Sequence, residues 1–353
     1  MTGDQLQFDH CLIVAEVAQA HEGSLGMAHA FIDAIAGTGA DAVKFQTHIA
    51  AAESSPQEPW RVNFSYQDPS RYDYWRRMEF TAEQWQGLAD HTRARGMIFL
   101  SSPFSLEAAD LLQKLDICAW KVGSGELTNV RLLNYMIATG KPVILSTGMS
   151  LPEEIDKSVK LVQNAGNELL VLQCTSKYPC APEDVGLNML DFYRQRYGCK
   201  VGLSDHSASI FPGITAAVLG ASMVEVHTTL SPHMFGPDVK ASLTIEELKQ
   251  LVNGVRYVEA MLKNPVNKEL MAASLNDLRS VFYKSLAARR DIMAGEILTE
   301  DMVCELKAGA GGIMPDQLNM FLGRRFTKAV TIGNKIQKED FTDGEAESSS
   351  SFS

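Results

Sequence analysis

The chain has 353 residues, a formal net charge of -11 at pH 7, 45% hydrophobic residues and 21% charged residues. This length allows one large domain and a smaller one, and the composition is ordinary for a globular protein. The acidic balance argues against nucleic acid or an anionic membrane as the main partner, and no apolar run reaches the roughly 18 residues of a spanning helix.

The six cysteines are scattered and form no C-x-x-C pair. This usage predicts reduced, mostly buried thiols rather than a disulfide framework. The N-terminal residues also lack the basic and apolar pattern of a secretory signal. We therefore expect a cytoplasmic protein.

Eight short apolar runs alternate with helical patterns along the first three quarters of the chain. The runs are Leu12–Val17, Ala42–Phe45, Met97–Leu100, Ala119–Val122, Pro142–Leu145, Leu169–Leu172, Val201–Leu203 and Met223–Val226. The helical patterns are Ala28–Ala36, Thr81–Arg95, Leu106–Leu115, Val130–Ala138, Pro152–Ala165, Leu187–Tyr197, Ile214–Leu219 and Ile245–Leu262. Apolar runs that alternate with helices indicate a parallel sheet. Eight such units fit an α/β fold of the closed (β/α)8 TIM-barrel type better than an open sheet.

The barrel is predicted over residues 1–263, and the segments after it differ from it in composition and in hydrophobic pattern. Residues 264–284 are typical of a linker with a short helix, and residues 285–342 predict a small, mostly-β domain. The acidic, Ser-rich residues 343–353 predict a disordered tail. Within the barrel, the Pro-rich and aromatic stretch Ser54–Tyr74 predicts a long loop, which in a compact domain is often functional.

Two histidines follow consecutive predicted strands. His206 ends the run in KVGLSDH, and His227 ends the run in VEVH. Because a TIM barrel places its active site at the carboxyl ends of its strands, these imidazoles could share one metal, with water or substrate in the other positions. The alternative is a pair of structural hydrogen-bonding histidines. His21, His48 and His233 lie in loops and are further candidates for a third contact.

Two lysines lie inside apolar strand runs, Lys44 in AVKF and Lys121 in AWKV. Lysine is rarely buried without a partner, so two at matching positions predict a pocket for a phosphate or carboxylate group. The candidate hydroxyl partners are Ser102, Ser124, Ser146 and Ser204. The Gly123-Ser124-Gly125 turn would also let backbone N–H groups approach an anion.

Three carboxylates are placed near the same strand ends. Glu16 lies within the first run and Glu126 just after the fourth. Each could neutralise the lysines, act as a base, or hold a substrate hydroxyl group. Asp238, in Gly236-Pro237-Asp238, could reach sugar hydroxyls or serve only as a turn residue.

Taken together, the sequence motifs around these residues resemble those of the sialic acid synthases, a family that includes N-acetylneuraminate, pseudaminate and legionaminate synthases. The motifs that carry the resemblance are AEVAQAHEGSL, AVKFQTH, FLSSPFS, WKVGSGE, PVILSTGM, KYP, VGLSDHS, VEVHTT and GPD, in that order along the chain. The C-terminal segment is similar to the antifreeze-like (SAF) domain of that family.

The resemblance implies condensation of phosphoenolpyruvate with a sugar aldehyde, such as N-acetylmannosamine, to a 3-deoxy-2-ulosonic acid and phosphate. By matching position, it assigns phosphoenolpyruvate binding to Lys44, Ser102, Lys121, Ser124, Ser146 and Ser204. It assigns acceptor binding to Gln46, Glu126, Tyr178 and Asp238. It assigns Mn or Mg, with Co possible, to His206 and His227, and places Glu16 near the reacting carbons to direct water or a proton. It also implies a homodimer with swapped C-terminal domains.

One phrase departs from the family pattern. The family carries Lys-Arg-Pro-Gly in its C-terminal domain, where the arginine touches the acyl-amino end of the sugar. This chain has Lys307-Ala308-Gly309 instead, so Ala308 stands at the arginine position. Arg324 or Arg325 is a candidate substitute, and a non-acetylated aldose or another aldehyde is an alternative acceptor.

Two other functional classes fit parts of the pattern. A Schiff-base aldolase would use Lys121 or Lys44 as its nucleophile with pyruvate. A non-catalytic sugar-binding protein could have kept the barrel fold, but it would not need polar residues at the ends of so many strands. The intact polar set argues against the second alternative.

Overall fold

A computed structural model describes residues 6–342. The chain forms two compact units that divide between Asn264 and Pro265, and each unit is described by itself. The expected tail, residues 343–353, lies outside the described residues. No helix in the described range is both long and apolar enough to cross a membrane.

The first unit is a ring of eight parallel strands. They are β1 (Leu12–Ala18), β2 (Ala42–Thr47), β3 (Ile98–Pro103), β4 (Trp120–Val122), β5 (Val143–Ser146), β6 (Leu169–Cys174), β7 (Lys200–Asp205) and β8 (Met223–Thr229). The hydrogen-bonded order is β3-β2-β1-β8-β7-β6-β5-β4, and the two end strands, β3 and β4, contact each other. The predicted α/β class and (β/α)8 architecture are therefore confirmed.

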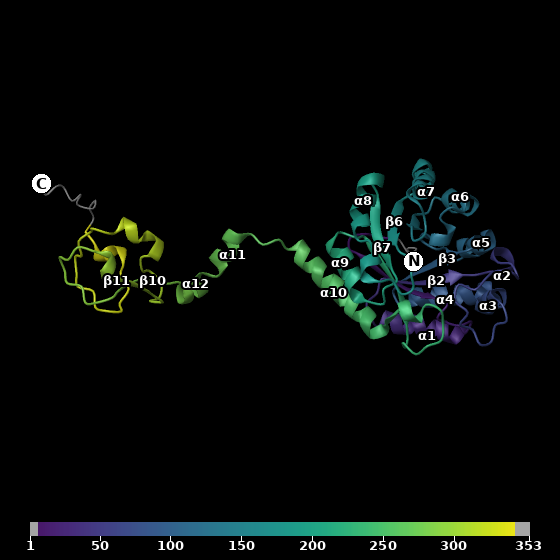
Figure 1. Cartoon of the computed structure of the whole chain (residues 1–353), viewed down its shortest axis with the longest axis horizontal. Helices are drawn as coiled ribbons and strands as arrows, with labels where there is room; N and C mark the ends of the chain where they lie inside the picture. Colours follow the sequence, from purple (N-terminus) through teal and green to yellow (C-terminus); the bar gives the residue numbers. More distant parts are fainter. Residues whose placement is uncertain (1–5, 343–353) are drawn as a thin grey trace. The chain divides into compact units, whose positions relative to one another are not determined.

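Helices surround the strands, as Figure 1 shows. They are α1 (Leu25–Ala36), α2 (Ala50–Glu53), α3 (Arg71–Met78), α4 (Ala82–Ala94), α5 (Leu106–Lys114), α6 (Val130–Ala138), α7 (Pro152–Ala165), α8 (Asn188–Tyr197), α9 (Ile210–Val218) and α10 (Ile245–Lys263). Local signals set several of their ends. Thr81 and Gln84 form a reciprocal capping box at the start of α4, and Gly166 ends α7 in the left-handed conformation.

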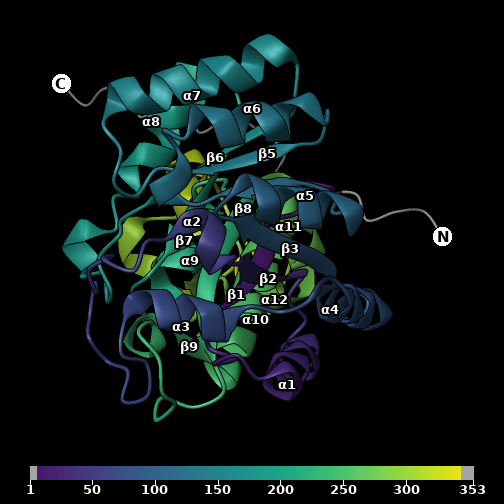
Figure 2. The same ribbon diagram turned by 90° about the vertical axis from the view of Figure 1, so that its right-hand side faces the viewer.

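The predicted loop Ser54–Tyr74 is wrong at its C-terminal end, because α3 begins at Arg71. The Ser70 side chain caps this helix by accepting a hydrogen bond from the Asp73 backbone. The short helix α2 was not predicted, and the irregular segment is confined to residues 54–70. Both helices lie on the near side of the barrel in Figure 2. Helix α9 also begins earlier than predicted, at Ile210.

Two apolar layers stabilise the barrel. The larger one lies between the strands and the surrounding helices and includes Phe31, Phe45, Trp85 and Trp120, all fully buried. The smaller one includes Val14, Leu100, Leu172 and Met223, which come from four strands of the ring. Burial of strand residues in both layers explains why the strands are apolar runs rather than alternating patterns.

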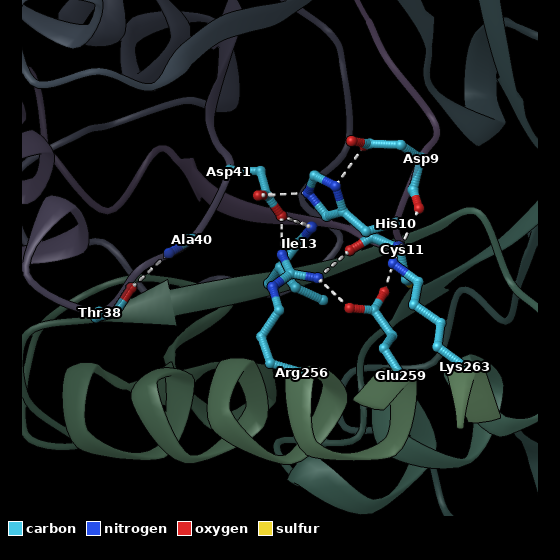
Figure 3. Close-up of polar contacts among 10 residues, drawn as sticks. All are labelled: Asp9, His10, Cys11, Ile13, Thr38, Ala40, Asp41, Arg256, Glu259 and Lys263. Carbon is cyan, nitrogen blue, oxygen red and sulfur yellow. Dashed lines mark hydrogen bonds and ion pairs between the residues drawn. The ribbon is translucent and has the colours of Figure 1, made fainter. Parts of the chain in front are cut away.

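A polar network ties the start of β1 to α10 (Figure 3). Arg256 Nη2 lies 2.6 Å from Asp41 Oδ2, and Arg256 Nη1 donates to the Cys11 carbonyl oxygen at 2.9 Å. Glu259 accepts from the Cys11 backbone N–H, and His10 lies between Asp9 and Asp41. The network therefore joins the two sequence ends of the barrel at the side opposite the carboxyl ends of the strands.

The second unit begins with two short helices, α11 (Lys268–Ser274) and α12 (Asn276–Phe282). It continues with the antiparallel pair β10 (Ser285–Ala288) and β11 (Val303–Leu306) and with isolated bridges such as Ile292 to Val330. A separate small core includes Leu286, Ile313 and Phe326.

Candidate functional site

A cavity of about 380 Å³ opens at the carboxyl ends of the strands. Every residue of the predicted site lines it: Glu16, Lys44, Gln46, Ser102, Lys121, Ser124, Glu126, Ser146, Tyr178, Ser204, His206, His227 and Asp238. The structure thus brings together side chains that the sequence distributes over more than 220 residues.

Strand register explains much of this convergence. Glu16 of β1 stands opposite Lys44 of β2 and opposite His227 of β8. On the next pair, Ser204 of β7 stands opposite Glu225 of β8. Because alternate strand residues share one face, Glu225 and His227 both line the cavity.

Two lysines and two glutamates form a buried ion cluster at the base of the cavity. Lys44 Nζ contacts a carboxylate oxygen of Glu16 and lies 3.7 Å from Glu225 Oε1. Lys121 Nζ lies 3.2 Å from the same Glu225 oxygen, and Ser204 Oγ donates to it at 3.2 Å. All four charged side chains are at most 6% exposed, so each depends on the others for its ionisation.

Burial shifts the pKa values of this cluster in different directions. Desolvation raises the pKa of Glu16 above its usual value, although Lys44 opposes the shift. Desolvation also acts on Glu225, but the charges of Lys121 and Lys44 outweigh it and lower that pKa. Desolvation lowers the pKa of Lys121. Glu16 is therefore the carboxyl group of this cluster best suited to take up or release a proton near neutral pH.

Hydroxyl groups surround the lysines. Ser102 Oγ accepts from Lys44 Nζ at 3.4 Å, and Ser124 Oγ accepts from the Gly148 backbone N–H at 3.0 Å. Ser146 Oγ is buried and has no hydrogen-bond partner within residues 6–342. A buried hydroxyl without a partner is costly, so this group fits a role as donor to a bound ligand. Two ammonium groups with these hydroxyls form an arrangement that can bind an anion.

The two histidines lie side by side, with ring centroids 5.3 Å apart. His206 Nδ1 donates to the Thr175 carbonyl oxygen at 2.9 Å. Because a carbonyl oxygen only accepts, this bond assigns the proton to Nδ1 and leaves Nε2 with a free lone pair. Burial lowers the pKa of His227 well below its usual value, which keeps that ring neutral. Burial opposes the shift, but hydrogen bonds to Cys174 and to the Thr175 backbone raise the pKa of His206. His227 is therefore ready to bind a metal ion, and His206 offers Nε2 to the same ion in its neutral form.

Within the described residues, the candidate metal site has two protein donors, the imidazoles of His206 and His227. No group of three or more His, Cys, Asp or Glu side chains within residues 6–342 has metal-ligand geometry. Of the other histidines considered, His48 lines the cavity. His21 instead is buried against Phe80, and His233 is exposed in its loop. The residues present fit an open ion site that needs water or substrate oxygens.

The acceptor candidates lie farther out, where the cavity is partly exposed. Arg61 Nη2 lies 2.6 Å from Asp238 Oδ1, and its guanidinium lies 4.4 Å above the centre of the Tyr178 ring. The Tyr178 ring in turn lies 4.2 Å from the His206 ring. Asp238, Arg61 and Tyr178 thus form one connected wall above the histidines.

Several lining residues were not among the predicted site residues. They are Gln19, Glu53, Glu58, Trp60, Arg61, Phe64, Arg71, Tyr74, Trp75, Phe104, Cys174, Ser176 and Glu225. Glu225 had a usable signal, because it lies inside an apolar run two residues before His227 and so shares its face. The stretch Ser54–Tyr74 was predicted only as a loop of the kind that is often functional. Which of its side chains line the cavity could not be predicted, since this depends on how an irregular segment folds over the cavity opening.

Comparisons with known proteins agree with this geometry. A family model described as the NeuB family matches residues 31–267. The chain is 33% identical over 323 residues to the N,N'-diacetyllegionaminic acid synthase of Campylobacter jejuni, covering 90% of this chain and 96% of the relative. It is 30% identical over 333 residues to the N-acetylneuraminate-9-phosphate synthase of Homo sapiens, covering 93% and 92%.

A solved structure gives the same result for the fold. The N-acetylneuraminic acid synthetase of Leptospira borgpetersenii, crystallised with citrate, superposes with a TM-score of 0.67 at 24% identity. The match covers 78% of this chain and 98% of that one.

Proposed function

Because the chain belongs to the NeuB family, we propose that it condenses phosphoenolpyruvate with a sugar aldehyde to give a sialic-acid-like 3-deoxy-2-ulosonic acid and phosphate. The observation that carries this proposal is the cavity itself, in which two buried lysines, four serines and two buried histidines converge from different parts of the barrel. The named relatives include a 9-phosphate synthase and a synthase whose name has no phosphate, so the acceptor class needs separate evidence.

Phosphoenolpyruvate would lie at the base of the cavity. Lys44 and Lys121 would bind its anionic groups, and the hydroxyls of Ser102, Ser124, Ser146 and Ser204 would complete the shell. One face of the enol double bond would then point toward the histidines. Holding the phosphate and carboxylate together fixes the enol carbon that forms the new bond.

The acceptor would occupy the partly exposed end. Gln46, Glu126, Tyr178 and Asp238 would contact its hydroxyl or amide groups. Gln46 Nε2 donates to Glu16 Oε1 at 3.2 Å, which links the acceptor end to the proton-exchanging carboxyl group. Glu16 would direct the water that attacks carbon two of phosphoenolpyruvate, and would take up its proton.

A divalent ion, Mn or Mg, with Co as a further choice, would be held by Nε2 of His206 and by His227. When bound, such an ion supplies Lewis-acid polarisation of a carbonyl oxygen. The hydrogen bond from His206 Nδ1 to Thr175 fixes the ring that would hold it.

The second unit would be the antifreeze-like domain of a domain-swapped homodimer. Its two helices expose Leu270, Leu278, Val281 and Phe282, each more than half exposed, which is unusual for surface positions that have no partner. Light scattering of the full chain tests this proposal, and a monomer at micromolar concentration would reject it.

The decisive experiment for the reaction is consumption of phosphoenolpyruvate in the presence of Mn and a panel of aldoses and acylamino sugars. We expect consumption that depends on both the metal and one acceptor. If no aldehyde and metal in the panel led to consumption of phosphoenolpyruvate, the result would instead favour a non-catalytic sugar-binding role for the barrel.

A Schiff-base aldolase is kept as the second candidate because burial lowers the pKa of Lys121, as such a nucleophile requires. Borohydride treatment with pyruvate distinguishes the two reactions. A trapped lysine would favour the aldolase, whereas an unmodified protein favours the condensation.

A further inference from the structure

A chain of hydrogen bonds leads from Glu16, at the base of the cavity, to Glu53 on helix α2. Gln46 Nε2 donates to Glu16 Oε1 at 3.2 Å, and Gln19 Nε2 donates to Gln46 Oε1. Gln19 Nε2 also lies 2.7 Å from His48 Nε2, and His48 Nδ1 lies 2.6 Å from Glu53 Oε1. All these side chains line the cavity, but only Glu16 and Gln46 have a role in the proposed reaction.

The chemistry of the linked groups gives this chain a direction. A carboxylate only accepts hydrogen bonds, so the contact with Glu53 places a proton on His48 Nδ1. An amide nitrogen only donates, so the contact with Gln19 requires an unprotonated His48 Nε2. His48 Nε2 and Gln46 Oε1 lie 3.3 Å apart, because both accept from the same Gln19 amide group. His48 is therefore neutral here, with its proton on the nitrogen that faces Glu53.

A proton on His48 Nε2 would reverse the direction of every bond between His48 and Glu16. Gln19 would have to present its oxygen to the ring, and Gln46 would have to present its nitrogen to Gln19. The oxygen of Gln46 would then face a carboxylate oxygen of Glu16, and two acceptors cannot form a hydrogen bond. The form of His48 thus decides which end of the Gln46 amide faces Glu16.

Packing holds the His48 ring where this chain needs it. Its centroid lies 4.2 Å from that of Trp75 and 4.5 Å from that of Phe104, and both pairs are stacked. The His48 and Glu53 side chains are at most 8% exposed. The Ile49 backbone N–H donates to the second oxygen of Glu53 at 3.3 Å. Two aromatic rings therefore fix the plane of His48, and an anchored carboxylate fixes its rotation within that plane.

We propose that His48 is a positioning residue that acts on Glu16 through two intervening side-chain amides. Its unprotonated Nε2 keeps the Gln46 nitrogen directed at Glu16, and this hydrogen bond fixes the carboxylate, whose other oxygen contacts Lys44. The inference rests on the proposed condensation, in which Glu16 directs water and takes up its proton. The alternative is that His48 only fills the space between two aromatic rings.

Two substitutions at position 48 separate these roles, because both remove the stacked ring. A glutamine side chain can place its amide oxygen near the position of Nε2 and accept from Gln19, whereas the shorter asparagine reaches only the position of Nδ1. The assay is consumption of phosphoenolpyruvate by the full chain with Mn and a reacting acceptor. We expect His48→Asn to lower kcat about tenfold or more, the rate factor of one hydrogen bond to a charged group. His48→Gln should keep kcat within about threefold of the unsubstituted chain. An equal or larger loss in His48→Gln would overturn the inference in favour of a packing role.

A further substitution tests the path through Gln19. Gln19→Met removes the amide that joins His48 to Gln46 and keeps an unbranched side chain of similar length. We expect it to lower kcat as much as His48→Asn does, and the double variant to show no further loss, because either change breaks the same chain. The KM for phosphoenolpyruvate should stay unchanged, since its binding lysines are intact. Multiplied losses in the double variant, or a raised KM with unchanged kcat, would contradict the inference.

The tautomer of His48 gives a readout that does not depend on turnover. In protein labelled with nitrogen-15 histidine, the chemical shifts of the ring nitrogens distinguish a protonated from an unprotonated nitrogen. The His48 signals are identified by their loss in His48→Gln. We expect a protonated Nδ1 and an unprotonated Nε2 at neutral pH, and a protonated Nε2 would overturn the inference. If no acceptor leads to consumption of phosphoenolpyruvate, the proposed condensation fails, while this measurement still decides the direction of the chain.

Discussion

Substitution of Glu225 tests the buried ion cluster most directly. Glu225→Gln removes the charge that two lysines share but keeps the side-chain volume. At an effective dielectric of about 20, distances of 3.2 and 3.7 Å correspond to attractions of about 5 and about 4 kcal/mol, against which desolvation acts. Breaking such a buried pair costs about 3–5 kcal/mol, so we expect a loss of that size in the free energy of unfolding.

The assay is urea unfolding followed by tryptophan fluorescence. The four tryptophans all belong to the barrel, so the signal reports on this unit alone. The matched control is Glu168→Gln, which loses a 2.7 Å pair with Lys200 whose side chains are more than 40% exposed. An exposed pair contributes about 0–1 kcal/mol, so the control should change little.

A double substitution distinguishes loss of the attraction between Lys121 and Glu225 from a general disruption of packing around them. In Lys121→Met with Glu225→Leu, both members of the pair become apolar, and replacement of a buried pair by apolar residues is often tolerated. We expect the double variant to be at least about 1.5 kcal/mol more stable than the sum of the two single losses predicts. Additivity within about 0.5 kcal/mol, or a cost below about 1 kcal/mol for Glu225→Gln, would refute the reasoning.

Three further predictions concern the histidines and the strand packing. His206→Ala should abolish metal-dependent consumption of phosphoenolpyruvate, while the exposed His233→Ala should not; full activity of the first variant would reject the two-histidine site. Partial burial lowers the pKa of His10, but hydrogen bonds to Asp41 and Asp9 outweigh this effect and raise it overall. The charged His10 ring therefore contributes its full stabilisation below about pH 6.5, and this stabilisation is lost as the pH rises through the raised pKa. His10→Gln should therefore cost a few tenths of a kcal/mol at pH 6 and less at pH 8 in urea unfolding, and a constant difference would contradict this assignment. Gly202→Ala should destabilise the barrel by about 1–3 kcal/mol, because its Cβ would lie 2.4 Å from the Met223 carbonyl oxygen; thermal unfolding with no change would show that the strands can separate there.

The sequence was sufficient to predict the eight strands because burial on both sides makes each of them an apolar run. The geometry of the barrel then placed the polar residues inside these runs, such as Lys44, and those that follow them, such as His227, around one cavity. Helix α3 was missed because its sequence is rich in arginine and aromatic residues and follows three prolines. Its start had a local signal, since Ser70 stands three residues before Asp73.

The partly exposed end of the cavity could not be predicted in this way. Arg61 and Asp238 are 177 residues apart, and neither lies in an element with a periodic pattern. Their contact depends on the packing of Phe64 against Phe235, which joins two irregular segments. Pairing between loops follows from side-chain shape rather than from backbone periodicity, so only the folded chain shows it.

The network between β1 and α10 also bears on how the protein is made. Cys11 and Glu259 are 248 residues apart, so the first strand leaves the ribosome long before its helical partner is synthesised. At about 5–20 residues per second, the delay is roughly ten to fifty seconds. During that time β1 lacks both α10 and its neighbour β8, and its unpaired edge is open to other chains. Completion of the barrel is therefore set by translation of its last helix, and chaperone protection of the nascent chain matters most before residue 259 emerges.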